Sequence, residues 1–173
     1  VESIFGSKKF LFFYITCGLG AAIIQILFNY YSFYSDLELL VSSGMLSDDI
    51  IQVLTEGKRA VLNEWARNFG LERIQNIYDI FRTPMVGASG AIYGIAVAFA
   101  LSFPNSKLML LFPPIPIKAK YLVSGLIVID LFFGFSTYSI GPFAHFAHIG
   151  GALTGFLIMY YWKKTQFNKN RWY

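Results

Sequence analysis

Apolar residues dominate four stretches of the chain, and each stretch suggests a helix that crosses a membrane. Crossing about 30 Å of hydrocarbon takes roughly 20 mostly apolar helical residues. No charged residue occurs from Phe10 to Ser35 or from Thr83 to Ser106. The pattern therefore predicts an all-α membrane protein, and a large soluble helical core is the alternative. The predicted spans are about Phe10–Tyr30, Met85–Phe103, Tyr121–Phe135 and Ala144–Trp162.

The segment 31–82, between the first two predicted spans, is more polar, with eight acidic and five basic residues. Ser35 and Glu38 have the spacing of a capping box, which predicts the start of a helix that stops at Gly44. Ser47 precedes two acidic residues, and this order favours a second helix start.

Apolar residues at helical spacing continue this second helix over 50–69, where Gly70 ends it. A third amphipathic helix is predicted from Leu71 to Phe81. We interpret 31–82 as an amphipathic helical insert that lies on or near the membrane surface. A solvated connector is the simplest role for such an insert, and a lid or a substrate-steering element is the alternative.

The composition agrees with a membrane protein: 55% of the residues are hydrophobic and 14% are charged, against about 25% charged in a typical soluble domain. The net charge of +4 comes from basic residues at the span ends and not from one basic face, which argues against nucleic-acid binding. Nine Lys or Arg flank one side and five flank the other, so we expect the Lys-rich side in the cytoplasm. Pro113, Pro114 and Pro116 mark a turn between the second and third spans on that side.

The single cysteine, Cys17, lies in an apolar run without a partner, so the sequence predicts neither a disulfide nor a zinc cluster. A small buried core residue is its expected role. The first residues, VESIFGSKK, lack both an initiator Met and the apolar core of a cleavable signal. We therefore expect the natural protein to extend further upstream.

The first candidate for chemistry is a run of small residues around one serine, Gly87-Ala88-Ser89-Gly90, with Tyr93 and Gly94 after it. A serine in a membrane helix commonly bonds back to a carbonyl one turn earlier, and small residues commonly serve close helix packing. The run also differs from the nucleophile elbow of soluble hydrolases, because Ala91 stands where that motif has its second glycine. On this run alone, packing is the stronger interpretation.

The second candidate is a histidine in the fourth predicted span, in the run Ala147-His148-Ile149-Gly150-Gly151. An ionisable residue inside a span is costly and is a functional hypothesis by default. His148, Gly151 and Gly155 share one helical stripe.

Gly90 and Gly94 form a matching pair of small residues on the other helix. Two such stripes let backbones approach closely, which would bring Ser89 Oγ within roughly 2.6–3.5 Å of a ring nitrogen of His148. Tyr93 lies one turn deeper than Ser89, where its ring could support the imidazole.

Two further ionisable residues need an explanation. His145 and His148 could begin a metal site, but no third ligand is close in sequence, so a water-facing position at the span entrance is favoured for His145. Asp130, inside the third span, is expected to bond to a neighbouring helix and not to take part in catalysis. No metal and no cofactor is predicted.

Together these residues resemble the rhomboid family, whose signature is a G-x-S-G helix followed by an A-H-x-x-G helix. Here the motifs stand as GASG and AHIGG, about 59 positions apart, with the tyrosine four residues after the serine. The first span, with Gly18 and Gly20, and the turn PPIPIKAKYL are also similar to the family. The resemblance implies that Ser89 is the nucleophile, His148 the general base and Tyr93 a supporting aromatic. It maps the packing glycines to Gly87, Gly90, Gly94, Gly151 and Gly155.

The implied fold is a rhomboid-like helical bundle with four of the family's six spans present. Residues 1–173 are accordingly expected to form one membrane domain, incomplete at its N-terminus, that contains the insert 31–82. The family's H-x-x-x-N element, which helps to bind the oxyanion, does not occur here, because His145 and His148 are the only histidines. The implied activity is intramembrane serine endopeptidase, by a Ser-His dyad without a carboxylate.

The implied partners are transmembrane protein substrates and the lipid bilayer. The implied location is a bacterial plasma membrane, with the active site open to the outer face. Two alternatives stay open: an inactive rhomboid relative that binds membrane clients without cleaving them, and a small membrane transporter, which would need polar groups along a path through the bilayer. The sequence leaves the substrate and the oligomeric state open.

Overall fold

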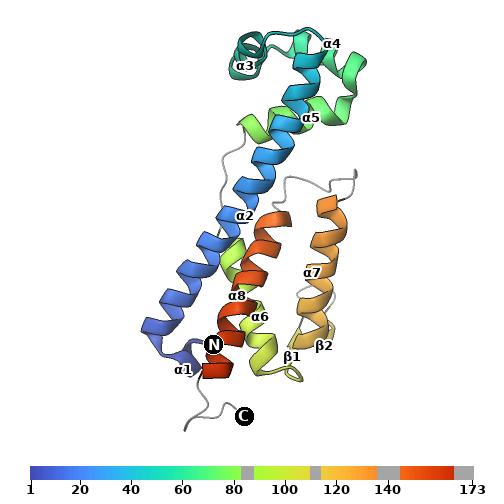
Figure 1. Ribbon diagram of the computed structural model, residues 1–173. Helices are drawn as coiled ribbons and strands as arrows, with labels where there is room; N and C mark the ends of the chain where they lie inside the picture. Colours follow the sequence, from blue (N-terminus) through green and yellow to red (C-terminus); the bar gives the residue numbers. More distant parts are fainter. Residues whose placement is uncertain (83–87, 110–113, 136–144, 166–173) are drawn as a thin grey trace. The chain divides into compact units, whose positions relative to one another are not determined.

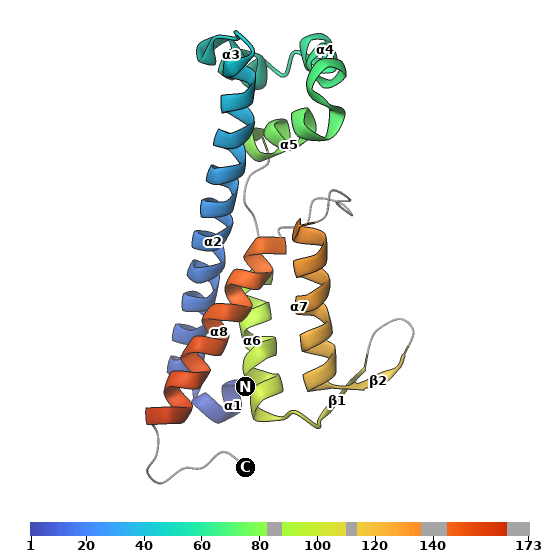
Figure 2. The ribbon, with the colours of Figure 1, turned by 45° about the vertical axis from the view of Figure 1, so that its right-hand side comes forward.

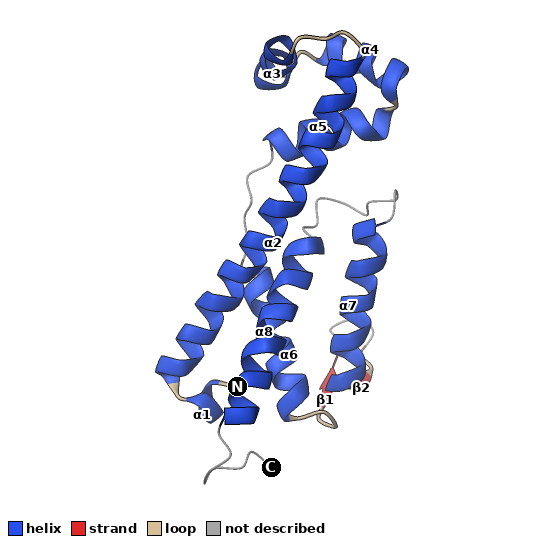
Figure 3. Ribbon diagram, viewed as in Figure 1, coloured by secondary structure: helices blue, strands red, loops and turns tan. Residues whose placement is uncertain are grey.

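The computed structural model describes residues 1–82, 88–109, 114–135 and 145–165, which are mostly helical with one short β-hairpin (Figures 1 and 3). The all-α fold expected from the sequence is therefore confirmed. The elements are α1 (Glu2–Phe5), α2 (Ser7–Ser42), α3 (Ser47–Glu56), α4 (Arg59–Phe69), α5 (Leu71–Arg82), α6 (Ser89–Ser102), β1 (Lys107–Met109), β2 (Pro116–Lys118), α7 (Ala119–Phe135) and α8 (His145–Thr165).

The chain divides into two compact units. The first unit consists of Val1–Gln25 and Gly87–Tyr173, and the second consists of Ile26–Val86. Helix α2 passes from the first unit into the second. The candidate residues for chemistry all belong to the first unit.

Among the described residues, α2 is the one helix whose length and apolar composition suit a membrane span. It runs unbroken for 36 residues, well past Tyr30, where the first span was expected to end. Helix α6 is apolar and has 14 residues, Ser89–Ser102; the start expected at Met85 lies outside the described residues. Helices α7 and α8, with 17 and 21 residues, match the third and fourth predicted spans in position. The number of spans stays a prediction.

The capping box at Ser35 and Glu38 was a wrong prediction, since both residues lie inside α2. No glycine or proline occurs between Gly20 and Gly44, so the sequence holds no strong helix breaker over this stretch. The stop itself was predicted correctly. Helix α2 ends at Ser42, and Gly44 follows with a φ of 98°, which glycine adopts without the strain of a side chain.

In the second unit, three short amphipathic helices follow α2. Helix α3 carries Asp48 and Asp49 in its first turn, as predicted, and negative charge is favourable there. The single helix expected over 50–69 is wrong: Gly57 takes a left-handed conformation, with a φ of 66°, and separates α3 from α4. Helix α5 corresponds to the third predicted helix.

The second unit has an apolar core of its own. Large side chains from the end of α2 and from α3, α4 and α5 pack together and exclude water, so this segment is a packed helical unit. Its position at a membrane surface stays a prediction. The buried members of the core are Leu40, Ile50, Val53, Leu54, Trp65, Ile74 and Ile77.

In the first unit, α6, α7 and α8 pack against one another (Figure 2), and α6 and α8 form the most extensive of these pairs. Burial of Cys17 confirms its expected role as a small core residue. The cluster that joins the N-terminal part of α2 to α6 and α8 consists of Phe13, Cys17, Ala91, Ala98 and Met159. The cluster that joins α6, α7 and α8 consists of Val97, Val123 and Ala152.

A short antiparallel hairpin lies between α6 and α7, where the prolines predicted only a turn. The register pairs Lys107 with Lys118, Leu108 with Ile117 and Met109 with Pro116. Pro116 is the first residue of β2, a position where a strand tolerates the missing N–H. Pro113 lies outside the described residues.

Leu54→Ala should loosen the second unit, because Leu54 is fully buried in its core. Truncation of a buried leucine costs about 2–5 kcal/mol. Amide hydrogen exchange of α3, α4 and α5 in the detergent-solubilised full-length protein would show the change as lost protection. Leu71→Ala is the matched control, since Leu71 is 67% exposed. Equal loss of protection in both variants would contradict this core.

Candidate active site

Helices α6 and α8 approach each other so closely that only glycine fits at their crossing. A Cβ atom added to Gly151 would overlap the backbone carbonyl group of Gly90. A Cβ atom on Gly155 would lie 2.7 Å from the Cα of Gly94, and one on Gly94 would lie 3.0 Å from the carbonyl oxygen of Gly151. The close contact between two glycine stripes that the sequence predicts is therefore present.

The N-terminal part of α2 adds a third helix to this packing. A Cβ atom on Gly90 would overlap Ala21, and one on Gly94 would overlap Cys17. Gly150 of α8 is equally confined, because its Cβ would lie 2.9 Å from the Cβ of Ile24. Small residues thus fix α2, α6 and α8 against one another inside the first unit.

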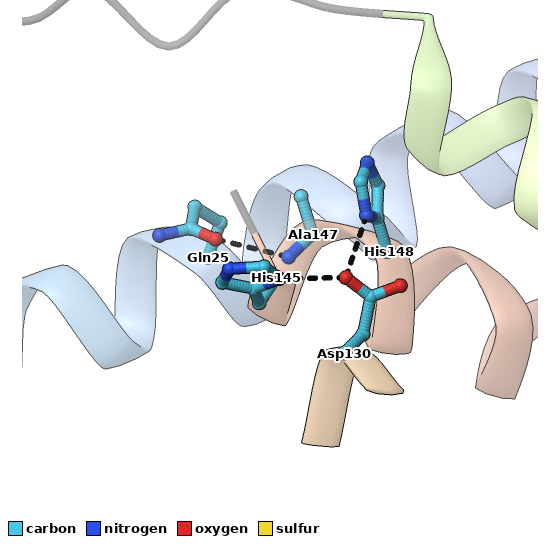
Figure 4. A network of polar contacts seen from close by, with 5 residues as sticks. All are labelled: Gln25, Asp130, His145, Ala147 and His148. Carbon is cyan, nitrogen blue, oxygen red and sulfur yellow. Dashed lines mark hydrogen bonds and ion pairs between the residues drawn. The ribbon is translucent and has the colours of Figure 1, made fainter. Parts of the chain in front are cut away.

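The start of α8 is capped by a side chain of α2 (Figure 4). The backbone N–H of Ala147 donates to Oε1 of Gln25 over 2.9 Å, and Gln25 is 9% exposed. The first N–H groups of a helix have no partner within the helix, so a buried helix start needs an acceptor from elsewhere. Sequence reasoning missed Gln25; its signal was an amide side chain within an apolar run.

Tyr93 of α6 and His148 of α8 stack face to face. Their ring centroids are 4.2 Å apart and the ring planes differ by 6°. Tyr93 lies one helical turn after Ser89, so the stack brings the imidazole to the first turns of α6. This is the placement that the spacing of Ser89 and Tyr93 predicts.

A carboxylate lies against His148. Asp130 of α7 is 5% exposed, and its Oδ1 is 3.1 Å from Nδ1 of His148 and 2.7 Å from Nδ1 of His145 (Figure 4). The side chain of Tyr93 also interacts with this carboxylate. The expected bond from Asp130 to a neighbouring helix is confirmed. The sequence did not reveal that one of its partners is His148, the candidate general base.

His145 is not water-facing, so that expectation was wrong. Its side chain is 12% exposed and its ring stacks against Phe133, with centroids 6.1 Å apart. The physical reason is the buried carboxylate of Asp130, which needs hydrogen-bond donors. In the described part of the chain, no group of three side chains is arranged to hold a metal ion.

Ser89 is the first residue of α6 and is half-buried. Within the described residues no hydrogen bond joins its hydroxyl to His148, so the short distance between them stays a prediction. The neighbouring residues do meet: a Cβ atom on Gly90 would lie 2.9 Å from the carbonyl oxygen of Ala147. Gly87, the remaining predicted glycine, lies outside the described residues.

A sequence model of the Rhomboid domain matches residues 1–165 of the 173-residue chain. The chain belongs to the rhomboid family. Rhomboid proteins are integral membrane proteins and are generally intramembrane serine proteases. Neither the curated proteins nor the solved structures contain a match to the chain.

Gly151→Ala should destabilise this rhomboid domain, because the new methyl group would overlap Gly90 and force α6 and α8 apart. Overpacking of this kind costs about 1–3 kcal/mol, which thermal unfolding in detergent would show as a lower midpoint. Gly125→Ala in α7 is the matched control, since no atom lies within 4 Å of the added Cβ. It should keep or raise the midpoint, because alanine is better than glycine inside a helix by about 0.5–1 kcal/mol. Equal midpoints would contradict the tight crossing.

Proposed function

We propose that this chain is an intramembrane serine endopeptidase in which Ser89 is the nucleophile and His148 is the general base. The α6–α8 crossing is the observation that carries the proposal: Gly90 contacts Gly151, and Tyr93 stacks on His148. Ser89 and His148 therefore lie on two helices that are in contact, near the residues that touch. Membership of the rhomboid family supports the same reaction.

The reaction is acyl transfer through Ser89. Because Nδ1 of His148 faces Asp130, Nε2 is the ring nitrogen that remains for the serine. Nε2 takes the hydroxyl proton as Oγ bonds to the substrate carbonyl carbon, and it gives the proton to the amine when the C–N bond breaks. Water then attacks the acyl-enzyme with the same base, which releases the carboxylic acid product and restores the serine. Catalytic hydrogen bonds that are long in a resting enzyme tighten when substrate binds.

The start of α6 supplies an oxyanion donor. Among the described residues, the first backbone bond of this helix runs from the N–H of Ile92 to the carbonyl of Ala88, and Ala88 forms no side-chain cap. The N–H of Ser89 therefore has no partner within the helix. In the proposed reaction, this N–H and the positive end of the helix dipole would stabilise the developing oxyanion.

The length of α6 supports a position for Ser89 below a membrane surface. Its 14 residues give a helix of about 21 Å, which is shorter than roughly 30 Å of hydrocarbon. If the end near Lys107 is at the cytoplasmic surface, Ser89 would be about 10 Å beneath the outer surface. The substrate is then a transmembrane segment that unwinds near the cut, because helical carbonyls are hidden in hydrogen bonds.

A transporter is less well supported than a protease. A transport path needs polar groups at several depths of the membrane. Among the described residues, the buried polar side chains are Gln25 and Asp130, and both make their contacts at the start of α8. Polar groups concentrated at one depth are typical of a reaction site.

Ser89→Ala and His148→Ala should each lower cleavage of a fluorescent transmembrane reporter by a factor on the order of 10³ or more, and the double variant should lose no more than either single variant. The assay uses the purified full-length protein in liposomes. Ser102→Ala at the other end of α6 is the matched control, because the Ser102 hydroxyl bonds to the carbonyl of Ala98 within the same helix.

Cleavage near the wild-type rate by the Ser89→Ala variant would assign the chemistry to another residue. A wild-type protein that binds the reporter without cutting it would be an inactive rhomboid relative.

A further inference from the structure

Asp130 is a buried carboxylate inside a helix, and such a group requires partners. Removing an ion from water costs several kcal/mol unless hydrogen bonds and opposite charge compensate. The compensation here comes from two imidazoles of α8, whose Nδ1 atoms both face Oδ1. Asp130 thus contacts the Nδ1 edge of the His148 ring. The Nε2 edge remains for Ser89.

The contact with Asp130 decides which nitrogen of His148 carries the proton. An ionised carboxylate only accepts hydrogen bonds, so a bond to it places a proton on Nδ1. A neutral imidazole has one protonated nitrogen, and the hydrogen bond at one nitrogen sets the state of the other. Nε2 then holds the lone pair that takes the proton of Ser89. The opposite tautomer has no acceptor at Nε2.

We propose that Asp130 is a positioning residue for His148. The nucleophile Ser89 then comes from α6, the base His148 from α8 and the carboxylate Asp130 from α7. This inference rests on the proposed function and adds to it, because the family resemblance implies a serine and a histidine alone. Asp130 fixes the tautomer and the orientation of the ring, and it faces the positive charge that the ring gains with the serine proton. Tyr93 holds the flat face of the same ring.

A purely structural role would be to join α7 and α8 by buried hydrogen bonds. His145 separates the two roles, because its Nδ1 bonds to the same oxygen from the same helix, one turn before His148. Replacing His145 removes a bond between the same two helices and leaves the His148 ring in place. A positioning role predicts different effects for Asp130 and His145, whereas a structural role predicts similar ones.

The tautomer can be read directly in the wild-type protein. We expect ¹⁵N NMR of histidine-labelled full-length protein, at a pH where the ring is neutral, to show His148 protonated on Nδ1 and unprotonated on Nε2. The His148→Gln variant identifies its signals by their loss. A wild-type His148 with its proton on Nε2 would overturn the proposal, and this result needs no variant of Asp130 that folds.

Asp130→Asn tests the consequence for turnover. The amide keeps the shape of the side chain but can donate to Nδ1, which selects the opposite tautomer of His148. We expect kcat to fall at least about a hundredfold with KM within about threefold, since the equivalent change in a soluble Ser-His-Asp protease costs about 10⁴ in kcat. The His148 signals should show the proton moved to Nε2. His145→Gln should lower kcat by less than about tenfold.

Two results would overturn the positioning role while the protease proposal stands. One is an Asp130→Asn variant that cleaves within about tenfold of wild type with the wild-type tautomer. The other is a His145→Gln variant as impaired as Asp130→Asn. Failure of the proposed function is distinguishable, because it would show as reporter cleavage that survives Ser89→Ala or as a wild type that does not cleave.

Discussion

The backbone contact between Gly90 and Gly151 is the constraint on which the rest of the site depends. The hydrophobic effect contributes little to the association of helices in an apolar environment. Close van der Waals packing of small residues must therefore hold these helices together. A single methyl group at Gly151 would overlap the facing carbonyl. With this contact in place, Ser89 and His148 lie on touching helices, and Tyr93 reaches the imidazole.

Buried polar side chains make their contacts at the start of α8. Gln25 accepts from the first turn of α8, and Asp130 bonds to both histidines of that helix. Each of these buried groups would be costly without its partner, and the contacts join the start of α8 to α2 and α7. A histidine held at an edge by a carboxylate and on one face by a tyrosine has little freedom left, which suits a general base.

The two units of the chain are stabilised in different ways. In the first unit, glycine, alanine and cysteine residues let apolar helices approach closely, and Phe13 and Met159 are buried beside them. The second buries large side chains such as Leu54 and Trp65 between short amphipathic helices, as soluble proteins do. A lid or a substrate-steering role for this second unit stays a prediction.

The sequence by itself determined the helical class, the rhomboid family and the stripes that bring α6 and α8 together, because these depend on local composition and on a period of 3.6 residues. It also indicated Ser89, Tyr93 and His148, since their motifs are contiguous. It did not determine that the first helix would continue past Tyr30 or that Gly57 would divide a helix. Only the tertiary structure brought Gln25 and Asp130 to α8, from 122 and 18 positions away. Contacts between distant positions depend on how helices pack, and no local pattern encodes that packing.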